Sequence, residues 1–163
     1  MNFLPKTQAL RLSRALFALG VAAVLGSTLS ACASVVSLDP APDSNNAACA
    51  EVTVRLPGQI DQLDKRQTDA QATGAWGTPA AVIARCGLPE VKVSALPCVT
   101  AGGVDWLVDD SAKPSYRFIS FGRNPATEVI VDSNLASGVS ALEAIAPAVE
   151  HIKATDHCLA SAK

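Results

Sequence analysis

The feature that most constrains this chain is its N-terminal segment, which has the pattern of a leader that is absent from the mature protein. Lys6, Arg11 and Arg14 give the segment a basic start, and an apolar run follows at 15–25. This order is typical of a secretory signal peptide. The run is far shorter than the roughly 20 residues that a helix needs to span a bilayer. Residues 1–31 therefore predict an export signal and not a permanent transmembrane helix.

The leader ends at residues 29–32 (LSAC), which resemble a lipobox. In that processing route the cysteine thiol receives a diacylglycerol, and a peptidase cuts just before the cysteine. Leu29 and the small Ala31 fit its requirements. The alternative is an ordinary secretion site that happens to precede a cysteine. We favour lipidation at Cys32, because both positions of the lipobox fit. Two acyl chains, at roughly 0.8 kcal/mol for each methylene, would then anchor the protein stably where one does not.

Removal of the leader makes the chain acidic. The leader holds three of the 13 Lys and Arg residues, so 10 remain against 15 Asp and Glu, a net charge near −5. The remaining cations are not clustered, which argues against nucleic acid as a partner and against a polybasic membrane patch. The expected membrane attachment is therefore the lipid at Cys32, on the extracytoplasmic face of the cell membrane.

Four cysteines remain after Cys32, namely Cys49, Cys86, Cys98 and Cys158. An even number in an exported chain predicts two disulfides, and the sequence allows three connectivities. One of them joins Cys49 to Cys158, at opposite ends of two predicted helices, and Cys86 to the nearby Cys98. Because no two cysteines stand at C-x-x-C spacing, we expect no zinc site, and we predict no cofactor.

The first part of the mature chain predicts one helix between two irregular stretches. Residues 32–47 contain many turn-forming side chains and predict a flexible tether. A helix is expected over 46–56, with Asn46 as its N-cap. Residues 59–75 are polar and lack the alternation of a strand, so we expect an exposed loop there.

Strand composition appears in the middle of the chain. The apolar run at 79–86 suits a buried strand that Gly87 stops, and 98–108 predicts one bent strand or a tight hairpin. Gly102 and Gly103 suit the type I′ or II′ turn of such a hairpin. The last two predicted strands are 116–121 and 127–131, joined by a hairpin turn at 122–125.

The C-terminal part predicts a helix from Ser137, because apolar residues recur at helical spacing as far as Ile152. Pro147 interrupts this pattern, and an interior proline costs about 3 kcal/mol, so we expect a kink or two short helices. The order of elements predicts an α+β fold. It would be a small two-layer domain over 48–163, with an antiparallel sheet of about four strands and an N-terminal and a C-terminal helix packed on it.

Several short motifs stand in a characteristic order. They are AWGTP at 75–79, RCGLP at 85–89, GVDWL at 103–107, YRF at 116–118 with GR at 122–123, EV at 128–129 and APAV at 146–149. Together they resemble the domain of unknown function 3515 family, from about Cys49 to Val149. Its members are small exported or lipid-anchored proteins of high-GC Gram-positive bacteria. The resemblance implies an envelope location and no particular activity.

The same resemblance bears on the disulfides. Some similar members carry only the two cysteines that match Cys49 and Cys86, and a lone pair in an exported domain is expected to be bonded to itself. The resemblance therefore favours a Cys49–Cys86 bond, which leaves Cys98 and Cys158 as the second pair.

The possible ligand surface contains the two tryptophans and a set of charged residues. Trp76 and Trp106 suit either an aromatic platform for a sugar or peptide or packing with the indole N–H satisfied, and we favour packing. Three arginines fall on or beside strands, where they would either converge on an anion or pair with Glu128 across a hairpin; we favour a pair of Arg117 or Arg123 with Glu128. These arginines are Arg85, Arg117 and Arg123.

Neither acidic residues nor histidines form a metal motif. Asp105, Asp109 and Asp110 lack the remainder of a calcium-loop pattern. His151 and His157 lie six residues apart on the predicted terminal helix, a spacing that does not place them on one face.

The leading hypothesis is a non-catalytic envelope module that binds a partner protein or a cell-wall component. The alternatives are an envelope enzyme acting on wall material, with Asp105, Glu128 and the arginines as its polar groups, and a thiol-redox protein. A concave pocket shared by Asp105, Glu128 and an arginine would favour the enzyme.

Overall fold

The computed structural model describes residues 34–158. The predicted leader and the lipidation site at Cys32 lie outside the described residues. Neither helix within the described range is long and apolar enough to cross a membrane.

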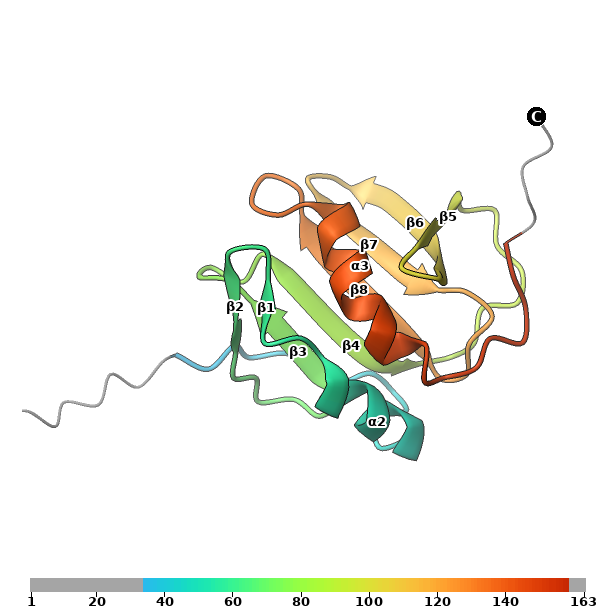
Figure 1. Ribbon diagram of the computed structural model, residues 1–163, viewed down its shortest axis with the longest axis horizontal. Helices are drawn as coiled ribbons and strands as arrows, with labels where there is room; N and C mark the ends of the chain where they lie inside the picture. The colour runs from blue at the N-terminus through green and yellow to red at the C-terminus, as the bar shows by residue number, and fades with distance from the viewer. Residues whose placement is uncertain (1–33, 159–163) are drawn as a thin grey trace, which may run out of the picture. The chain divides into compact units, whose positions relative to one another are not determined.

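An antiparallel sheet of eight strands, in the order β1-β2-β3-β4-β8-β7-β6-β5, forms most of the structure. Adjacent strands along the chain pair with one another, except that β4 pairs with β8, so the β5–β8 meander returns to the middle of the sheet (Figure 1). The strands are β1 (Gln59–Ile60), β2 (Leu63–Arg66), β3 (Thr73–Trp76), β4 (Val82–Leu88), β5 (Cys98–Ala101), β6 (Val104–Ala112), β7 (Ser115–Ser120) and β8 (Ala126–Asp132).

The sheet is larger than the four strands expected, and the protein is mostly β. The strands at 79–86, 116–121 and 127–131 and the hairpin at Gly102-Gly103 are found within a few residues of their predicted places. The polar stretch 59–75, expected as a loop, instead supplies β1 to β3. Two of these strands have only two and four residues. In β3 every residue is buried, so no alternation of period two marks it.

Two helices cover one face of the sheet. Helix α2 (Ala47–Arg55) begins after Asn46, whose side-chain oxygen accepts from the N–H of Ala48 at 3.0 Å, which confirms the predicted cap. Helix α3 (Gly138–Val149) begins after Ser137, whose hydroxyl accepts from the N–H of Ser140.

Of the two outcomes expected at Pro147, two short helices are wrong, because α3 is one helix that ends only two residues later. A proline in the last turn removes few of the helical hydrogen bonds. Ile152 and His151, expected on the helix, lie in the turn that follows it.

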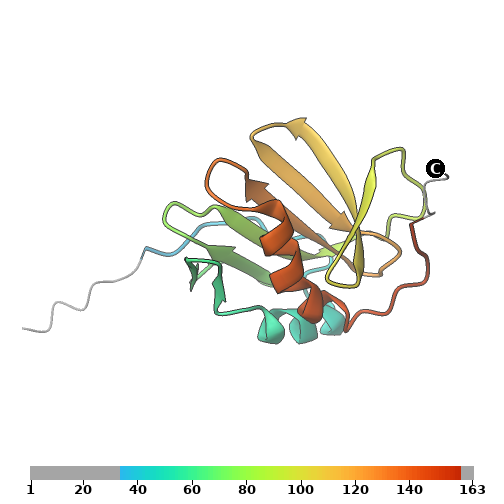
Figure 2. The ribbon, with the colours of Figure 1, turned by 45° about the horizontal axis from the view of Figure 1, so that its top comes forward.

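The main core fills the space between the two helices and the sheet (Figures 1 and 2). Helix α2 buries Cys49 and Val52, and α3 buries a stripe that includes Ile145 and Val149. Both tryptophans lie in this core and have no exposed surface.

The segment at 34–46, expected to be a free tether, runs along the sheet face opposite the helices (Figure 1). Val36 forms a parallel bridge with Thr68. Asp43 donates its N–H to the carbonyl of Gly87 at 2.9 Å, and a Cβ at Gly87 would lie 2.6 Å from the backbone of Asp43. Gly87 therefore does not stop β4 as predicted. Its φ of +117° forms a bulge, and the strand continues to Leu88.

Candidate functional site

An apolar groove lies on the helix-covered face, between α3 and the hairpin formed by β5 and β6. Its volume is about 440 Å³, within the range of sites that take small ligands or side chains. Strands β5 to β8 form its floor and far wall, and the first turns of α3 form its near wall. The lining residues are Val99, Thr100, Ala101, Val108, Tyr116, Phe118, Val131, Ser133, Ser137, Gly138, Val139, Leu142 and Glu143.

Two close contacts hold α3 above the sheet and leave this space between them. Near the start of the helix, a Cβ at Gly138 would lie 3.2 Å from the ring of Phe118. Further along the helix, a Cβ at Gly102 in the β5–β6 turn would lie 2.5 Å from the Cβ of Ala146. The helix therefore rests on β7 at one point and on the hairpin turn at another.

The rim of the groove exposes apolar side chains. Val99 on β5 is 42% exposed and Val139 on α3 is 62% exposed. Among the described residues that line the groove, Glu143 is the one with a charged side chain, and it is exposed. The groove is thus an apolar surface with a single negative charge beside it.

The tryptophans of the predicted ligand surface do not form a platform. Trp76 donates its indole N–H to the carbonyl of Pro57 at 2.9 Å, and Trp106 donates to the carbonyl of Ala101 at 3.3 Å. Both side chains are fully buried, so the packing interpretation is confirmed.

Glu128 lies between two arginines on the sheet face opposite the groove. One of its carboxylate oxygens accepts from Arg85, its partner on β4, and the other accepts from Arg117 on β7. Glu128 is fully buried, whereas both arginines reach solvent. Arg85 also donates to the carbonyl of Asp39 at 3.1 Å, which joins the N-terminal segment to this cluster. The predicted pair of Arg117 with Glu128 is confirmed. Arg85 is a second partner, whereas the other predicted partner, Arg123, donates to the carbonyl of Ile152 instead.

Arg123 lies apart from the other two arginines. Its side chain is buried and donates through Nη1 to the carbonyl of Ile152. Burial lowers the pKa of its guanidinium, an effect that the nearby charges of Glu150 and Asp105 partly oppose. Arg123 therefore holds the chain that follows α3, and it forms no common anion site with Arg85 and Arg117.

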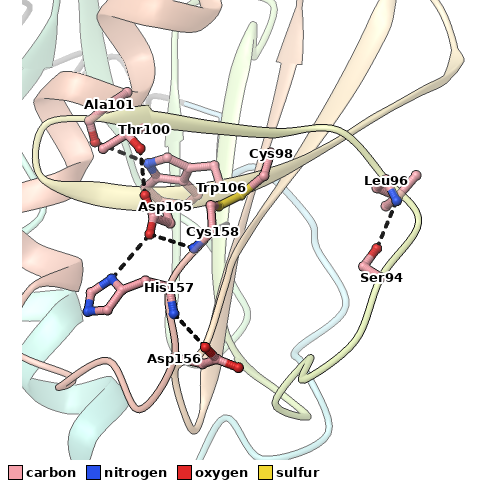
Figure 3. The surroundings of a disulfide bond; sticks show 10 residues. All are labelled: Ser94, Leu96, Cys98, Thr100, Ala101, Asp105, Trp106, Asp156, His157 and Cys158. Atoms are coloured by element: carbon pink, nitrogen blue, oxygen red, sulfur yellow. Dashed lines mark hydrogen bonds and ion pairs between the residues drawn. A yellow bond between two sulfur atoms is a disulfide. The ribbon is translucent and has the colours of Figure 1, made fainter. Parts of the chain in front are cut away.

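Asp105 attaches the C-terminal segment to the β5–β6 hairpin (Figure 3). Its carboxylate accepts from the Thr100 hydroxyl at 2.6 Å and from the Cys158 N–H at 3.0 Å, and it lies 3.2 Å from Nδ1 of His157. Burial alone would raise the pKa of Asp105. The contacts with Thr100, Cys158 and His157 together outweigh burial and hold that pKa below its ordinary value. His157, expected on the terminal helix, lies in this extended segment instead.

The disulfides join Cys49 to Cys86 and Cys98 to Cys158, with Cα–Cα distances of 5.5 and 6.1 Å. This is the pairing that the family resemblance favoured, and the alternative of Cys49 with Cys158 is wrong. The first bond joins α2 to β4, and the second joins the C-terminal segment to the start of β5.

Residues 12–157 match the model of a family described as a protein of unknown function, DUF3515. The chain belongs to this family. Comparisons with curated proteins and with solved structures each found no match. The function of this DUF3515 protein is therefore inferred from the groove and from the contacts of Glu128, Arg123 and Asp105.

The polar groups named for an enzyme do not come together at the groove of this DUF3515 protein. Asp105 lies beside the hairpin turn and Glu128 lies on β8, and neither residue lines the groove. Both carboxylates are already occupied by protein donors. No group of three or more His, Cys, Asp or Glu within residues 34–158 could hold a metal ion.

Sequence reasoning missed the groove. Val139 belonged to the apolar stripe predicted to pack on the sheet, and its large exposure could not be inferred from helical spacing. One available signal was the lack of any charged residue at 98–101, the strand that forms the edge of the sheet.

Proposed function

We propose that this chain is a non-catalytic binding module, held by a lipid at Cys32 on the outer face of the cell membrane. Its partner is an envelope protein or a cell-wall component, and its ligand site is the groove between α3 and the strands β5 to β8. The observation that carries the proposal is the apolar lining of that groove, with Val99 and Val139 exposed at its rim. Apolar surface of this kind on a soluble domain is typical of an interaction site.

The same geometry supports binding over the two alternatives. An enzyme acting on wall material would need free polar groups in the groove, but its lining holds one carboxylate, Glu143, and hydroxyls. A thiol-redox protein needs an accessible reactive sulfur. The Cys49–Cys86 pair is buried. The exposed Cys98 is bonded to Cys158, which lies 60 residues away and not at the C-x-x-C spacing of thiol-redox motifs.

Photo-crosslinking in living cells tests the ligand site. A benzophenone amino acid is placed at Val139 on the groove rim or, as a matched control, at Val54, a 76% exposed valine on α2 that does not line the groove. We expect one discrete adduct from position 139 and none of the same mass from position 54. The adduct should disappear when Val99→Asp adds a charge to the opposite rim. Identical adducts from both positions would show that the groove is not the ligand site.

Detergent partitioning tests the anchor separately. The wild-type protein should enter the detergent phase, and globomycin should block its processing. Cys32→Ala should abolish both behaviours, since the thiol that carries the lipid is gone. If Cys32→Ala still partitions with detergent, lipidation at this residue is wrong.

A further inference from the structure

Strand β5 is the last strand of the described sheet, and its residues 99–101 line the groove. Within residues 34–158 it pairs with β6 on one side only. Cys98, Val99 and Thr100 are exposed, and the strand carries no charged residue. Natural edge strands are commonly protected by charges, prolines or a covering element. Strand β5 is short but otherwise open.

The register shows which backbone groups of β5 are free. The carbonyl of Asp105 accepts from the N–H of Phe121 at 2.8 Å, so Asp105 turns its backbone groups toward β7 and away from β5. Asp105 is the residue directly opposite Thr100. Two residues that lie directly opposite each other in an antiparallel ladder either exchange backbone hydrogen bonds or both point their N–H and C=O groups away from each other. The N–H and C=O of Thr100 therefore point outward from the sheet.

The groove and the free edge meet at Val99 and Thr100. Val99 is paired with the core residue Trp106, so its side chain lies on the helix-covered face and reaches the groove. Thr100 also lines the groove, although its hydroxyl is donated to Asp105 on the other face. What Thr100 offers to a ligand is mainly its backbone. An apolar groove beside unpaired strand groups is the arrangement that binds extended peptides.

We propose that the ligand of this groove is an extended segment of another polypeptide, which adds to β5 as a further strand. This inference rests on the proposed function and specifies its ligand. The backbone of the segment pairs with Thr100, and its alternate apolar side chains enter the groove. Strand β5 has four residues, so the paired stretch is about 13 Å long at roughly 3.3 Å per residue.

The charge of Glu143 indicates which residues the bound peptide segment should contain. Glu143 is the charged residue of the lining, and it lies at the end of the groove nearest the β5–β6 turn, where a Cβ at Gly102 would lie 3.3 Å from its Cα. The mature chain is acidic overall. A Lys or Arg next to the apolar residues of the segment would pair with Glu143, and an acidic segment would be repelled.

Selection from a phage library of random heptapeptides on the purified protein tests this proposal. The enriched peptides should carry apolar residues at alternate positions together with a Lys or Arg. Two N-methylated forms of a selected peptide are compared, one methylated at the odd residues and one at the even residues. One form should lose binding, because it lacks the N–H groups that face β5, and the other should keep it. Glu143→Lys should reduce the affinity for the same peptide at least tenfold.

Two variants of the protein test the role of the edge. Thr100→Pro removes the outward N–H without removing a bond to β6, a place where edge strands tolerate proline. Thr100→Val loses the same hydroxyl but keeps the N–H. We expect Thr100→Val to bind the selected peptide at least tenfold more tightly than Thr100→Pro. If Thr100→Pro does not fold, the N-methyl series alone decides between backbone pairing and side-chain contact.

Several outcomes would overturn the proposal. Selection without an alternating pattern, or equal binding by the two N-methylated forms, excludes strand addition. If the adduct at Val139 is a lipid and no peptide is selected, the occupant is an acyl chain: the groove is then the ligand site, but its partner is not the envelope protein or cell-wall component proposed. If the wild-type protein is a dimer that Thr100→Pro dissociates, the occupant is a second copy of this chain. If position 139 gives no discrete adduct in the otherwise wild-type protein, the proposed function is refuted, whatever the peptide selection shows.

Discussion

Glu128 shows how a single buried charge is accommodated in this sheet. Its carboxylate has no contact with solvent, but each oxygen accepts from an arginine whose side chain extends to the surface. A buried charge requires such partners, since its removal from water is costly. The cluster spans β4, β8 and β7 and also holds residue 39 of the N-terminal segment.

Glu128→Gln should lower the free energy of unfolding by about 2 kcal/mol, because the amide keeps one acceptor oxygen for one arginine and turns an NH2 donor toward the guanidinium of the other. Replacing the whole cluster with Arg85→Met, Arg117→Met and Glu128→Leu should cost less than Glu128→Gln alone, because no uncompensated charge is left. Urea denaturation of both variants measures the difference. A Glu128→Gln protein as stable as wild type would show that the cluster contributes nothing.

Asp105 gives the attachment of the C-terminal segment a dependence on pH. Its pKa is lower in the folded protein than its ordinary value. The stability that its carboxylate contributes is therefore complete above about pH 3.9 and is lost as the pH falls through the lower folded value.

Asp105→Asn should cost about 1–2 kcal/mol at pH 7, since the amide cannot accept from Thr100 and Cys158 as the carboxylate does. The difference from wild type should shrink as the pH falls below about 3.9. Unfolding measured across this range, with hydrogen exchange at the Cys158 amide, tests both statements. A difference that does not change with pH would mean that the carboxylate charge is not responsible.

At the scale of elements, the β5–β6 hairpin and α3 determine each other's positions. Gly102 and Gly103 both have positive φ, +58° and +78°, as a type I′ turn requires. The two glycines differ in their neighbours. A Cβ at Gly102 would meet Ala146 on the helix, whereas a Cβ at Gly103 would meet the end of the flexible Glu150 side chain.

Gly102→Asn and Gly103→Asn form a matched pair, because asparagine tolerates positive φ at both turn positions. We expect Gly102→Asn to cost about 1–3 kcal/mol through overpacking against α3, and Gly103→Asn to cost clearly less. Urea unfolding of each variant provides the comparison. Equal losses would show that backbone conformation, and not contact with the helix, determines the cost.

At the scale of the whole described structure, one disulfide joins helix α2 to the sheet and the other joins the C-terminal segment of the described residues to it. Cys49–Cys86 joins residues 37 apart and is buried beneath α2, while Cys98–Cys158 joins residues 60 apart and has an exposed member. The C-terminal segment has further attachments, among them the hydrogen bond from the Thr155 N–H to Gly122 at 2.7 Å.

Dithiothreitol without denaturant should therefore reduce Cys98–Cys158 first, because a reductant can reach Cys98 in the folded protein. Alkylation followed by mass spectrometry identifies the order. Cys49→Ala with Cys86→Ala should lower the unfolding free energy by about 4 kcal/mol. Cys98→Ala with Cys158→Ala should mainly increase amide exchange at 154–158. Simultaneous reduction of both bonds would contradict the difference in access.

The sequence by itself determined the features that depend on neighbouring residues. Asn46 and Ser137 mark the starts of the helices because a cap acts within a few residues. The Gly102-Gly103 turn and the connection at 122–125 were predictable because turn chemistry sets hairpin geometry locally. The pairing of Glu128 with arginine was expected from charges on adjacent strands.

Only the tertiary structure decided which surfaces remain open. The strands β1 to β3 exist because short or fully buried segments find partners across the sheet, which no local period indicates. Residues 34–46 lie on the sheet because Gly87 leaves room for Asp43. The groove lies beside the two places where α3 contacts the sheet, namely Phe118 on β7 and the Gly102 turn. Val99 and Val139 are 40 residues apart along the chain. Both line the groove because other residues, Phe118 with Gly138 and Gly102 with Ala146, position α3 beside the hairpin.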